Sequence, residues 1–315
     1  MRELLFFNQV FKEKIWGGSK LKAMFNVDEG ISNIGECWTV SAHLNGLSTV
    51  RNGSFQGLTL KQLWKEKKEL FGSIEGDEFP LLIKFIDAGE DLSIQVHPDD
   101  EYAGQWANGS KGKTECWYIL DCTSNCEIIF GHNASTKEEF EKLVLQGAWS
   151  LLLNKLTVYK DDFIYVPSGT VHALKQGTMV LEIQQPSDVT YRLYDYDRVE
   201  NGKPRQLHIK ESIDVAMVPH WIESYEPQVC KGNGFTKTVL IQNSFFKVIK
   251  YEINGAMAQT QDEPFVVMGV IEGSGSIDGI EVKIGDHWLI PYDYGCYRLE
   301  GKMTIIASNT VPKTY

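Results

Sequence analysis

Short runs of β-branched and aromatic residues, separated by Gly, Pro, Asn and Asp, extend through most of this 315-residue sequence. Such runs include LLIKFIDA (81–88), LSIQVH (92–97), ECWYIL (115–120), CEIIFG (126–131), FIYVPSG (163–169), MVLEIQQ (179–185) and FFKVIKYEI (245–253). Runs of this length and spacing are typical of antiparallel sandwiches and barrels, whereas βαβ folds alternate strands with amphipathic helices. We therefore expect a mainly β protein.

Helical patterns are confined to two inserts, at about residues 58–71 and 136–147. In the first insert, Thr59 and Gln62 have the spacing of a capping box ahead of LKQLWKEKKEL. In the second insert, Ser135 and Glu138 have the same spacing ahead of an amphipathic run. Neither insert carries a catalytic spacing, so we expect both to be packing elements.

A duplication and a loop-rich segment predict two domains. The stretch DDFIYVPSGTVH (161–172) aligns without gaps with GDHWLIPYDYGC (285–296), which indicates a repeated barrel unit. Prolines and the Gly-rich KGNGF place a boundary near 225–235. The predicted domains are residues 1–230, with both helical inserts, and residues 231–315. Because Cys296 aligns with His172, we expect only the first barrel to carry chemistry.

Composition excludes several classes of protein. The net charge of −11 and the absence of a Lys/Arg run argue against nucleic acid or an anionic membrane as a partner. No apolar run is long enough to span a bilayer, and the N-terminus does not have the pattern of a signal peptide. The six cysteines are scattered, so we expect reduced thiols in a cytoplasmic protein. Cys122 and Cys126 have no second pair at zinc-finger spacing, which favours small buried residues over a zinc site.

Four residues form a candidate metal site. Gln95 and His97 alternate along one strand, so both side chains point to the same face. The turn PSGTVH delivers His172 at the start of a strand, and Glu115 opens the strand ECWYIL. Two imidazoles, a carboxylate and an amide oxygen suit Zn²⁺, with Mn²⁺, Fe²⁺ and Co²⁺ as alternatives, and leave open coordination positions. An open position favours catalysis over a structural role.

These two segments, Gly-x5-Gln-x-His and Pro-x-Gly-x-x-His, resemble the two metal-binding motifs of the cupin superfamily. The resemblance implies two jelly-roll barrels of the double-stranded β-helix type, with the metal in the first. Within this superfamily, FKEKIWGG (11–18), SIQVHP (93–98), GKTECWYIL (112–120) and the run ending in TYRLYDYDR (190–198) resemble the short bacterial type I phosphomannose isomerases. Seventeen residues lie between His97 and Glu115, an insertion that this narrower family shares.

The narrower resemblance implies a function and a set of site residues. It implies an enzyme that interconverts mannose 6-phosphate and fructose 6-phosphate through a cis-enediol, with one Zn²⁺ per chain on Gln95, His97, Glu115 and His172. It also implies Arg192 as the catalytic arginine, and Lys84, Lys113 and Asp188 as polar residues of the pocket. Lys84, Lys113, Arg192 and Ser168 are the expected substrate contacts.

Three questions stay open at this point. The general base is one of Lys113, Asp188 and Lys84; Lys113 shares a strand face with Glu115, and desolvation beside a metal would lower its pKa. A metal-dependent cupin dioxygenase and a non-catalytic sugar-binding cupin are alternative functions, although Gln95 and the Lys/Arg complement favour a sugar phosphate. The oligomeric state is not predicted.

Overall fold

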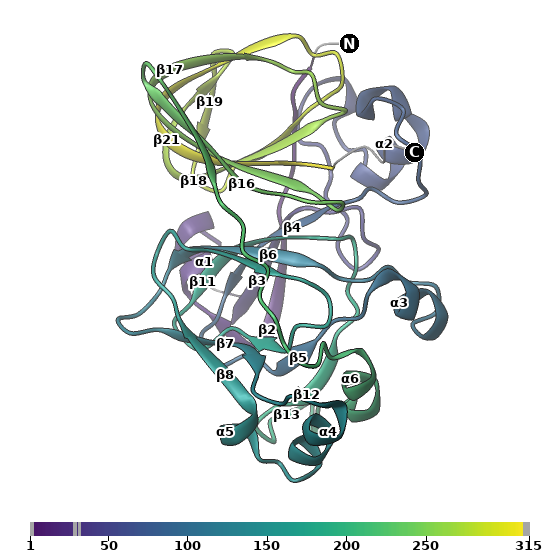
Figure 1. Ribbon diagram of the computed structural model, residues 1–315. Helices are drawn as coiled ribbons and strands as arrows, with labels where there is room; N and C mark the ends of the chain where they lie inside the picture. Colours follow the sequence, from purple (N-terminus) through teal and green to yellow (C-terminus); the bar gives the residue numbers. More distant parts are fainter. Residues whose placement is uncertain (1–2, 28–29, 31–32, 311–315) are drawn as a thin grey trace. The chain divides into compact units, whose positions relative to one another are not determined.

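The computed structural model describes residues 3–27, 30 and 33–310. The strands are β1 (Leu5–Phe6), β2 (Val10–Gly18), β3 (Ile34–Val40), β4 (Leu82–Asp87), β5 (Ile94–Val96), β6 (Glu115–Asp121), β7 (Glu127–His132), β8 (Leu153–Thr157), β9 (Phe163–Val166), β10 (His172–Ala173), β11 (Met179–Gln184), β12 (Tyr191–Tyr194), β13 (Val199–Glu200), β14 (Lys203–Pro204), β15 (Gln228–Gly232), β16 (Phe235–Gln242), β17 (Lys247–Thr260), β18 (Val266–Ile277), β19 (Ile280–Lys283), β20 (His287–Ile290) and β21 (Cys296–Asn309). The helices are α1 (Lys20–Phe25), α2 (Leu60–Glu66), α3 (Asp100–Trp106), α4 (Lys137–Leu145), α5 (Trp149–Leu152) and α6 (Ile209–Val215), with 3₁₀ turns η1 (Gly53–Phe55) and η2 (Lys68–Phe71). The predicted mainly β character is confirmed (Figure 1).

The chain forms two compact units. Unit 1 consists of Met1–Val10, Trp38–Ile83 and Ser224–Tyr315, and unit 2 of Phe11–Cys37 and Lys84–Glu223. The predicted division into residues 1–230 and 231–315 is contiguous, whereas these units are not, because two N-terminal segments group with the C-terminal strands. Whether residues 1–230 and 231–315 fold as separate domains stays a prediction.

Unit 1 is built on a sheet with strand order β1-β20-β18-β21-β17-β16-β15, with β19 paired to β18. Its long strands curve around a common interior (Figure 1). This interior is filled by large apolar side chains, among them Trp288, Tyr251 and Tyr297, each no more than 1% exposed. The N-terminal strand completes the sheet, since Leu5 pairs with Leu289 and Phe6 with Trp288.

Unit 2 consists mainly of two antiparallel sheets. One has the order β2-β3-β4-β11-β6-β9 and the other β12-β5-β10-β7-β8. A buried cluster joins them, with Trp16, Ile86 and Trp117 from the first sheet and Ile128 and Phe130 from the second. The inward faces therefore alternate apolar side chains with the polar residues described below, as expected for a barrel-like sandwich.

The aligned repeat segments occupy equivalent structural positions. Residues 163–166 form β9, and their aligned partners, residues 287–290, form β20. His172 and the aligned Cys296 both begin a strand, β10 and β21 respectively. The agreement in strand boundaries supports the predicted duplication of a β unit.

The first predicted helical insert is confirmed: Thr59 and Gln62 form the capping box of α2, and η2 ends at Phe71 with Gly72 as its C-cap. In the second insert the predicted cap is wrong by one residue. The extended backbone of Thr136, not Ser135, places a hydroxyl to accept from the Glu139 N–H at 3.2 Å, so α4 begins at Lys137. The other helices have at most seven residues, too few for a clear amphipathic period.

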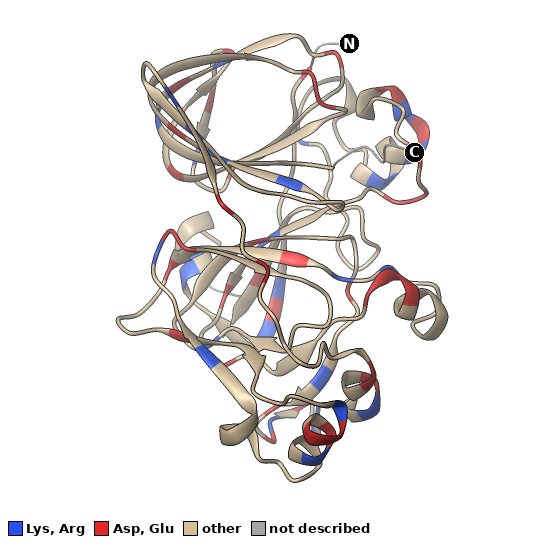
Figure 2. Ribbon diagram, in the orientation of Figure 1, with Lys and Arg blue, Asp and Glu red and all other residues tan. Residues whose placement is uncertain are grey.

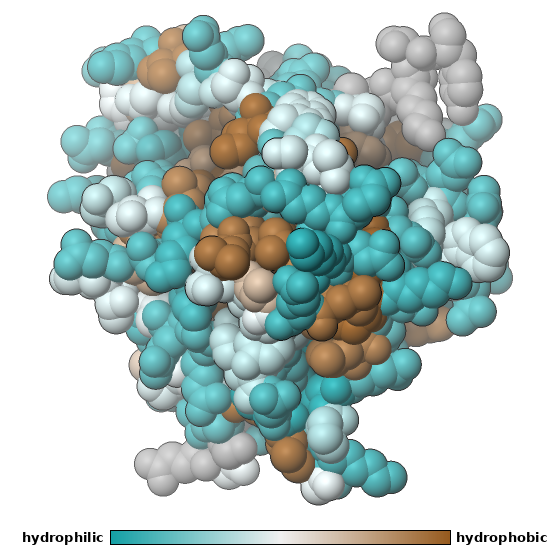
Figure 3. All heavy atoms as spheres, turned by 60° about the horizontal axis from the view of Figure 1, so that its bottom comes forward, coloured by the Kyte–Doolittle hydropathy of each residue, from teal (hydrophilic) through white to brown (hydrophobic). Residues whose placement is uncertain are grey.

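No helix in the described part of the chain has the length and apolar character needed to cross a membrane. The helices α3, α4 and α6 of unit 2 carry acidic residues, drawn in red in Figure 2. On the face shown in Figure 3, hydrophobic residues form separate patches among hydrophilic ones.

Candidate metal centre and active-site cavity

Pairing between strands places the predicted residues side by side in unit 2. In the second sheet, Gln95 on β5 pairs with His172 on β10 and, on its other side, with Arg192 on β12. Glu115 begins β6 in the first sheet. The sequence resemblance did not supply this register, which sets an amide, an imidazole and a guanidinium in one row.

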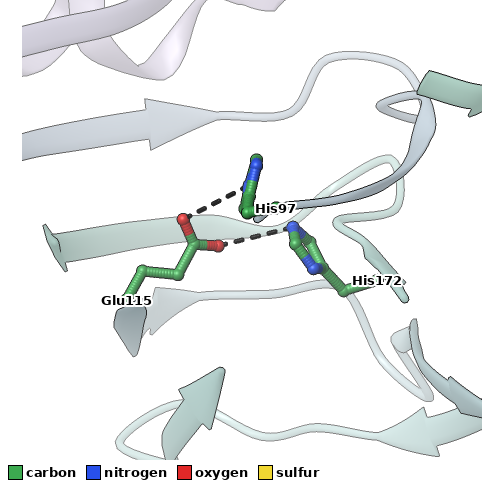
Figure 4. Close-up of side chains that lie close together, drawn as sticks. All are labelled: His97, Glu115 and His172. Carbon is green, nitrogen blue, oxygen red and sulfur yellow. Dashed lines mark ion pairs between the residues drawn. The ribbon is translucent and has the colours of Figure 1, made fainter. Parts of the chain in front are cut away.

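The side chains of His97, Glu115 and His172 converge (Figure 4). The Nε2 atom of His97 lies 3.6 Å from Glu115 Oε2, and that of His172 lies 3.4 Å from Glu115 Oε1. Tetrahedral zinc with bonds of about 2.0–2.1 Å holds neighbouring ligand atoms about 3.4 Å apart. All three ligand atoms lie within 4.8 Å of one another, so the spacing fits one small divalent cation.

Backbone carbonyls orient both imidazoles. The Nδ1 atom of His97 lies 2.8 Å from the Val189 carbonyl oxygen, and that of His172 lies 2.9 Å from the Thr170 carbonyl oxygen. Each Nδ1–H therefore donates outward, which leaves the Nε2 lone pair directed at Glu115. Burial lowers the pKa of both rings, that of His172 to about 4. Both imidazoles are thus neutral at neutral pH, the form that binds metals.

Glu115 completes the donor set. Its side chain is fully buried, and within the described residues its Oε1 has no hydrogen-bond donor. Burial and then the charge of Glu182 raise the pKa of this carboxyl. A cation at the site would supply the missing partner and favour ionisation. The amide of Gln95 lies 3.3 Å from His172 Nε2, close enough for its oxygen to join the set after rotation.

Lys113 lies against the same ligand atoms. Its Nζ is 2.9 Å from Glu115 Oε2 and 3.1 Å from His97 Nε2, and its side chain is buried. The prediction that Lys113 shares a face with Glu115 is therefore met by the geometry. A primary amine is held beside the metal ligands, within reach of anything that binds there.

A network of buried ion pairs lies on the first sheet, near the candidate metal ligands. Lys84 Nζ lies 2.7 Å from Glu182 Oε2 and 3.8 Å from Glu36 Oε1, and Trp117 donates to Glu182 Oε1 at 3.0 Å. Burial alone would lower the pKa of Lys84, but the two carboxylates outweigh it and raise that pKa. Burial would likewise raise the pKa of Glu182, yet Lys84 and Lys113 lower it. This buried pair therefore stays ionised.

These groups surround a cavity of about 230 Å³ in unit 2. Its lining contains the cationic side chains Lys14, Lys84, Lys113, Arg192 and Arg205, the carboxylates Glu36, Glu182 and Asp188, and, among others, Trp16, Ser93, Gln95, Thr190, His172 and His208. Five cationic and three acidic side chains line the cavity itself, which suits an anion although the whole chain is acidic. Two more carboxylates outside the lining, Glu115 and Asp195, pair with Lys113 and Arg205.

Arg192 and Arg205 lie on one wall of the cavity. Arg192 donates from Nη1 to the Gln206 carbonyl at 2.9 Å and from Nε to Ser93 Oγ at 3.3 Å. Arg205 donates through Nε and Nη2 to both oxygens of Asp195. Ser168 does not line the cavity; its backbone N–H bonds to Thr114 Oγ1 instead. The structure thus brings together every predicted site residue except Ser168.

Known proteins that are similar to this chain identify its family. The family profile "Phosphomannose isomerase type I, catalytic domain" matches residues 4–122, and "Mannose-6-phosphate isomerase, cupin domain" matches residues 236–310. Mannose-6-phosphate isomerase ManA of Bacillus subtilis (strain 168) is 49% identical over 98% of this chain and 99% of its own length. The chain belongs to the type I phosphomannose isomerase family.

Further relatives extend the same result. A mannose-6-phosphate isomerase of Streptococcus mutans is 42% identical over 98% of this chain and 99% of its own length. The crystal structure of mannose 6-phosphate isomerase from Bacillus subtilis matches with a TM-score of 0.95 at 46% identity, covering 97% of this chain and 99% of that one. A structure from Archaeoglobus fulgidus, with a TM-score of 0.75 at 20% identity, shares the fold. The predicted cupin fold and isomerase class are confirmed.

Sequence reasoning missed several cavity residues of this phosphomannose isomerase family member. Glu36 and Glu182 hold Lys84, and Arg205 and His208 line the wall beside Arg192. Glu36 and Glu182 are the sole carboxylates in the strand runs IGECWTV and MVLEIQ, in which every residue is buried. A charged residue inside an otherwise buried strand requires a partner, and this signal points to both of them.

Proposed function

We propose that this family member interconverts mannose 6-phosphate and fructose 6-phosphate, with one zinc ion per chain held by Gln95, His97, Glu115 and His172. The observation that carries the proposal is the single cavity in which five cationic side chains surround the amide and imidazole of that ligand set. A sugar phosphate has both parts that such a cavity accommodates: an anionic end and a row of hydroxyl and carbonyl oxygens.

The reaction needs a base and charge stabilisation. A proton moves between C1 and C2 of the open-chain sugar through a cis-enediol or enediolate, while a second proton exchanges between O1 and O2. A zinc ion on these ligands would supply Lewis acidity toward the sugar oxygens. The residues around it have to orient the chain, exclude water and accept or return the protons.

The ion pairs separate Lys84 from the candidates for the general base. Lys84 is held protonated between Glu182 and Glu36, so it suits donation to a sugar oxygen and not abstraction of a proton from carbon. Lys113 and Asp188 stay as candidate bases, and both line the cavity. Lys113 is the better placed, because its Nζ lies within 3.1 Å of His97 Nε2.

The phosphate suits the part of the cavity lined by Arg192 and Arg205. Arg192 and Arg205 are planar donors fixed by hydrogen bonds to Gln206 and Asp195, and Lys14 adds a further charge. Planar guanidinium groups match phosphate oxygens in a bidentate manner. Arg205 therefore replaces Ser168 in our proposed set of substrate contacts, which otherwise contains Lys84, Lys113 and Arg192.

A coupled assay with mannose 6-phosphate tests the function. We expect turnover by the purified protein, loss after exhaustive treatment with a chelator, and recovery when Zn²⁺ is restored. Mannose 6-phosphate that binds without turnover would favour a sugar-binding cupin, and oxygen consumption with Fe²⁺ would favour a dioxygenase; either result would contradict the proposal. A cytoplasmic location, which the six free cysteines support, belongs to the same proposal.

A further inference from the structure

His132 and the segment that follows α6 form a chain of hydrogen bonds that ends at the metal ligands. His132 is the last residue of β7 and is 4% exposed. Its Nε2 lies 2.9 Å from the Met217 carbonyl oxygen, so Nε2–H is the donor. The Met217 N–H in turn donates to the Gly169 carbonyl at 2.8 Å, and the Gly169 N–H donates to the His97 carbonyl at 2.8 Å.

Gly169 connects this series of hydrogen bonds to the histidine ligands. It lies in the turn that delivers His172, and the Thr170 carbonyl of that same turn accepts from His172 Nδ1. Its φ is +85°, and an added Cβ would lie 3.1 Å from the Val215 carbonyl oxygen and 3.3 Å from Met217. The turn and the Met217 segment are thus fitted to each other, and both histidine ligands depend on the turn: His97 through its carbonyl, His172 through its ring.

Contacts from α4 also hold the Met217 segment and the His132 ring. Lys137 donates from Nζ to the carbonyls of Asp214 at 2.9 Å and Ala216 at 3.0 Å. The His132 ring packs on Phe140 with ring centroids 4.6 Å apart. These contacts join α4 to the segment, and the Met217 N–H carries the link on to Gly169. The backbone of β7 also reaches the strand of His172 directly, because the Gly131 N–H donates to the Val171 carbonyl at 2.7 Å.

We infer that His132 is a positioning residue for the metal centre: by holding Met217 it fixes the 167–170 turn and so sets the affinity of the His97/His172 pair for its cation. The inference rests on the metal site proposed above. Groups that orient metal ligands change metal affinity by about 10- to 100-fold when removed. His132 acts through one peptide link, so we expect the lower end, about tenfold.

Zinc affinity of the apoprotein, measured by competition with a chromophoric chelator, tests the inference without any assay of turnover. His132→Leu removes the donor and should weaken Zn²⁺ binding about tenfold. His132→Gln keeps an N–H donor at the end of a side chain of similar reach and should restore most of the affinity. Phe140→Leu is the matched control: it removes packing against the same ring, and should lower the melting temperature while leaving zinc affinity unchanged.

Other results would overturn the inference. Equal zinc affinity in His132→Leu and the wild type, with a melting temperature lowered as in Phe140→Leu, would make His132 a packing residue alone. If His132→Leu does not fold, Lys137→Met loosens the same segment from an exposed position and should weaken zinc binding about two- to threefold; no change would count against the inference. If the wild-type protein bound no Zn²⁺, or if His172→Ala bound it as tightly as the wild type, both the proposed metal site and this inference would be wrong.

Discussion

Glu115 and Glu182 lie in one unit and one buried environment, yet their surroundings shift their pKa values in opposite directions. Burial and Glu182 raise the pKa of Glu115, while Lys84 and Lys113 outweigh burial and lower the pKa of Glu182. Opposed shifts of this kind assign different roles to like groups. Glu182 is a fixed anion that keeps Lys84 charged, and Glu115 is the carboxyl that a cation would ionise.

The histidine ligands give the first prediction at the scale of single residues. His97→Ala and His172→Ala should each lose both bound metal and isomerase activity, because each removes one of two neutral imidazoles from a compact donor set. Cys122→Ser and Cys126→Ser should lose neither. Metal content by plasma emission and the coupled assay measure these effects. If only the cysteine variants lost metal, Cys122 and Cys126 would be the ligands and the assignment to His97 and His172 would be wrong.

Arg192→Lys is expected to reduce kcat about hundredfold, which corresponds to roughly 3 kcal/mol of transition-state stabilisation. The ammonium keeps the charge but cannot reproduce the planar donors that Gln206 and Ser93 hold in place. Zinc content should not change. Arg298→Lys, at an exposed position of unit 1, is the control and should leave kcat unaltered. Near-normal kcat with a lowered melting temperature would assign Arg192 to the scaffold.

At the scale of elements, the hairpin of β13 and β14 is tied to β12 by one carboxylate. Asp195 is 3% exposed and accepts from Arg198, just before the hairpin, and from Arg205, just after it. Burial raises the pKa of Asp195, but the hydrogen bonds from Arg205 and Arg198 outweigh it, so the net shift is downward. The hairpin thus positions Arg205 at the cavity wall through a charge-assisted network.

Asp195→Asn should therefore lower the free energy of unfolding by about 2 kcal/mol at neutral pH, since the three hydrogen bonds from Arg198 and Arg205 lose their charged acceptor. Because the folded-state pKa is below the unfolded one, the contribution of Asp195 is present above the unfolded-state pKa and is lost as pH falls through the folded-state value. Urea unfolding of both proteins at pH 7 and near pH 3 measures this difference. A gap that does not narrow in acid would contradict the assignment.

The elements also show what sequence can and cannot supply. His97, Glu115 and His172 follow from local motifs, because each motif is short and strand alternation fixes the side-chain direction. The Lys84–Glu182 pair joins neighbouring strands almost a hundred residues apart in the chain, and only strand pairing brings it together. The register that sets Gln95 between His172 and Arg192 has the same origin. Local sequence patterns predict which side chains share a face of a strand, but they do not predict which strand pairs with it.

At the scale of the whole molecule, chelation should abolish turnover and leave the far-ultraviolet circular dichroism nearly unchanged. The cores of both units consist of large buried apolar side chains that do not depend on a metal. A collapse of the dichroism signal on removal of the metal would show that the ion is needed for folding.

Metal content should be one equivalent per chain. In the second barrel unit, Cys296 stands in the place of His172 and is exposed, so a matching ligand set is missing from the aligned positions. Equilibrium dialysis against Zn²⁺, with His97→Ala as the comparison, measures the stoichiometry. More than one equivalent that persists in His97→Ala would contradict this prediction.

The pairing of Leu5 with Leu289 links the beginning of the chain to its last strands. During synthesis at about 5–20 residues per second, β1 leaves the ribosome on the order of tens of seconds before its partner β20 exists. Unit 2 contains no segment beyond Glu223, so its sheets have all their strands earlier. The apolar side chains of Leu5, Phe6 and Phe7 therefore await burial in the nascent chain. Because contacts of such long sequence separation slow folding, we expect unit 1 to be the slower unit to fold.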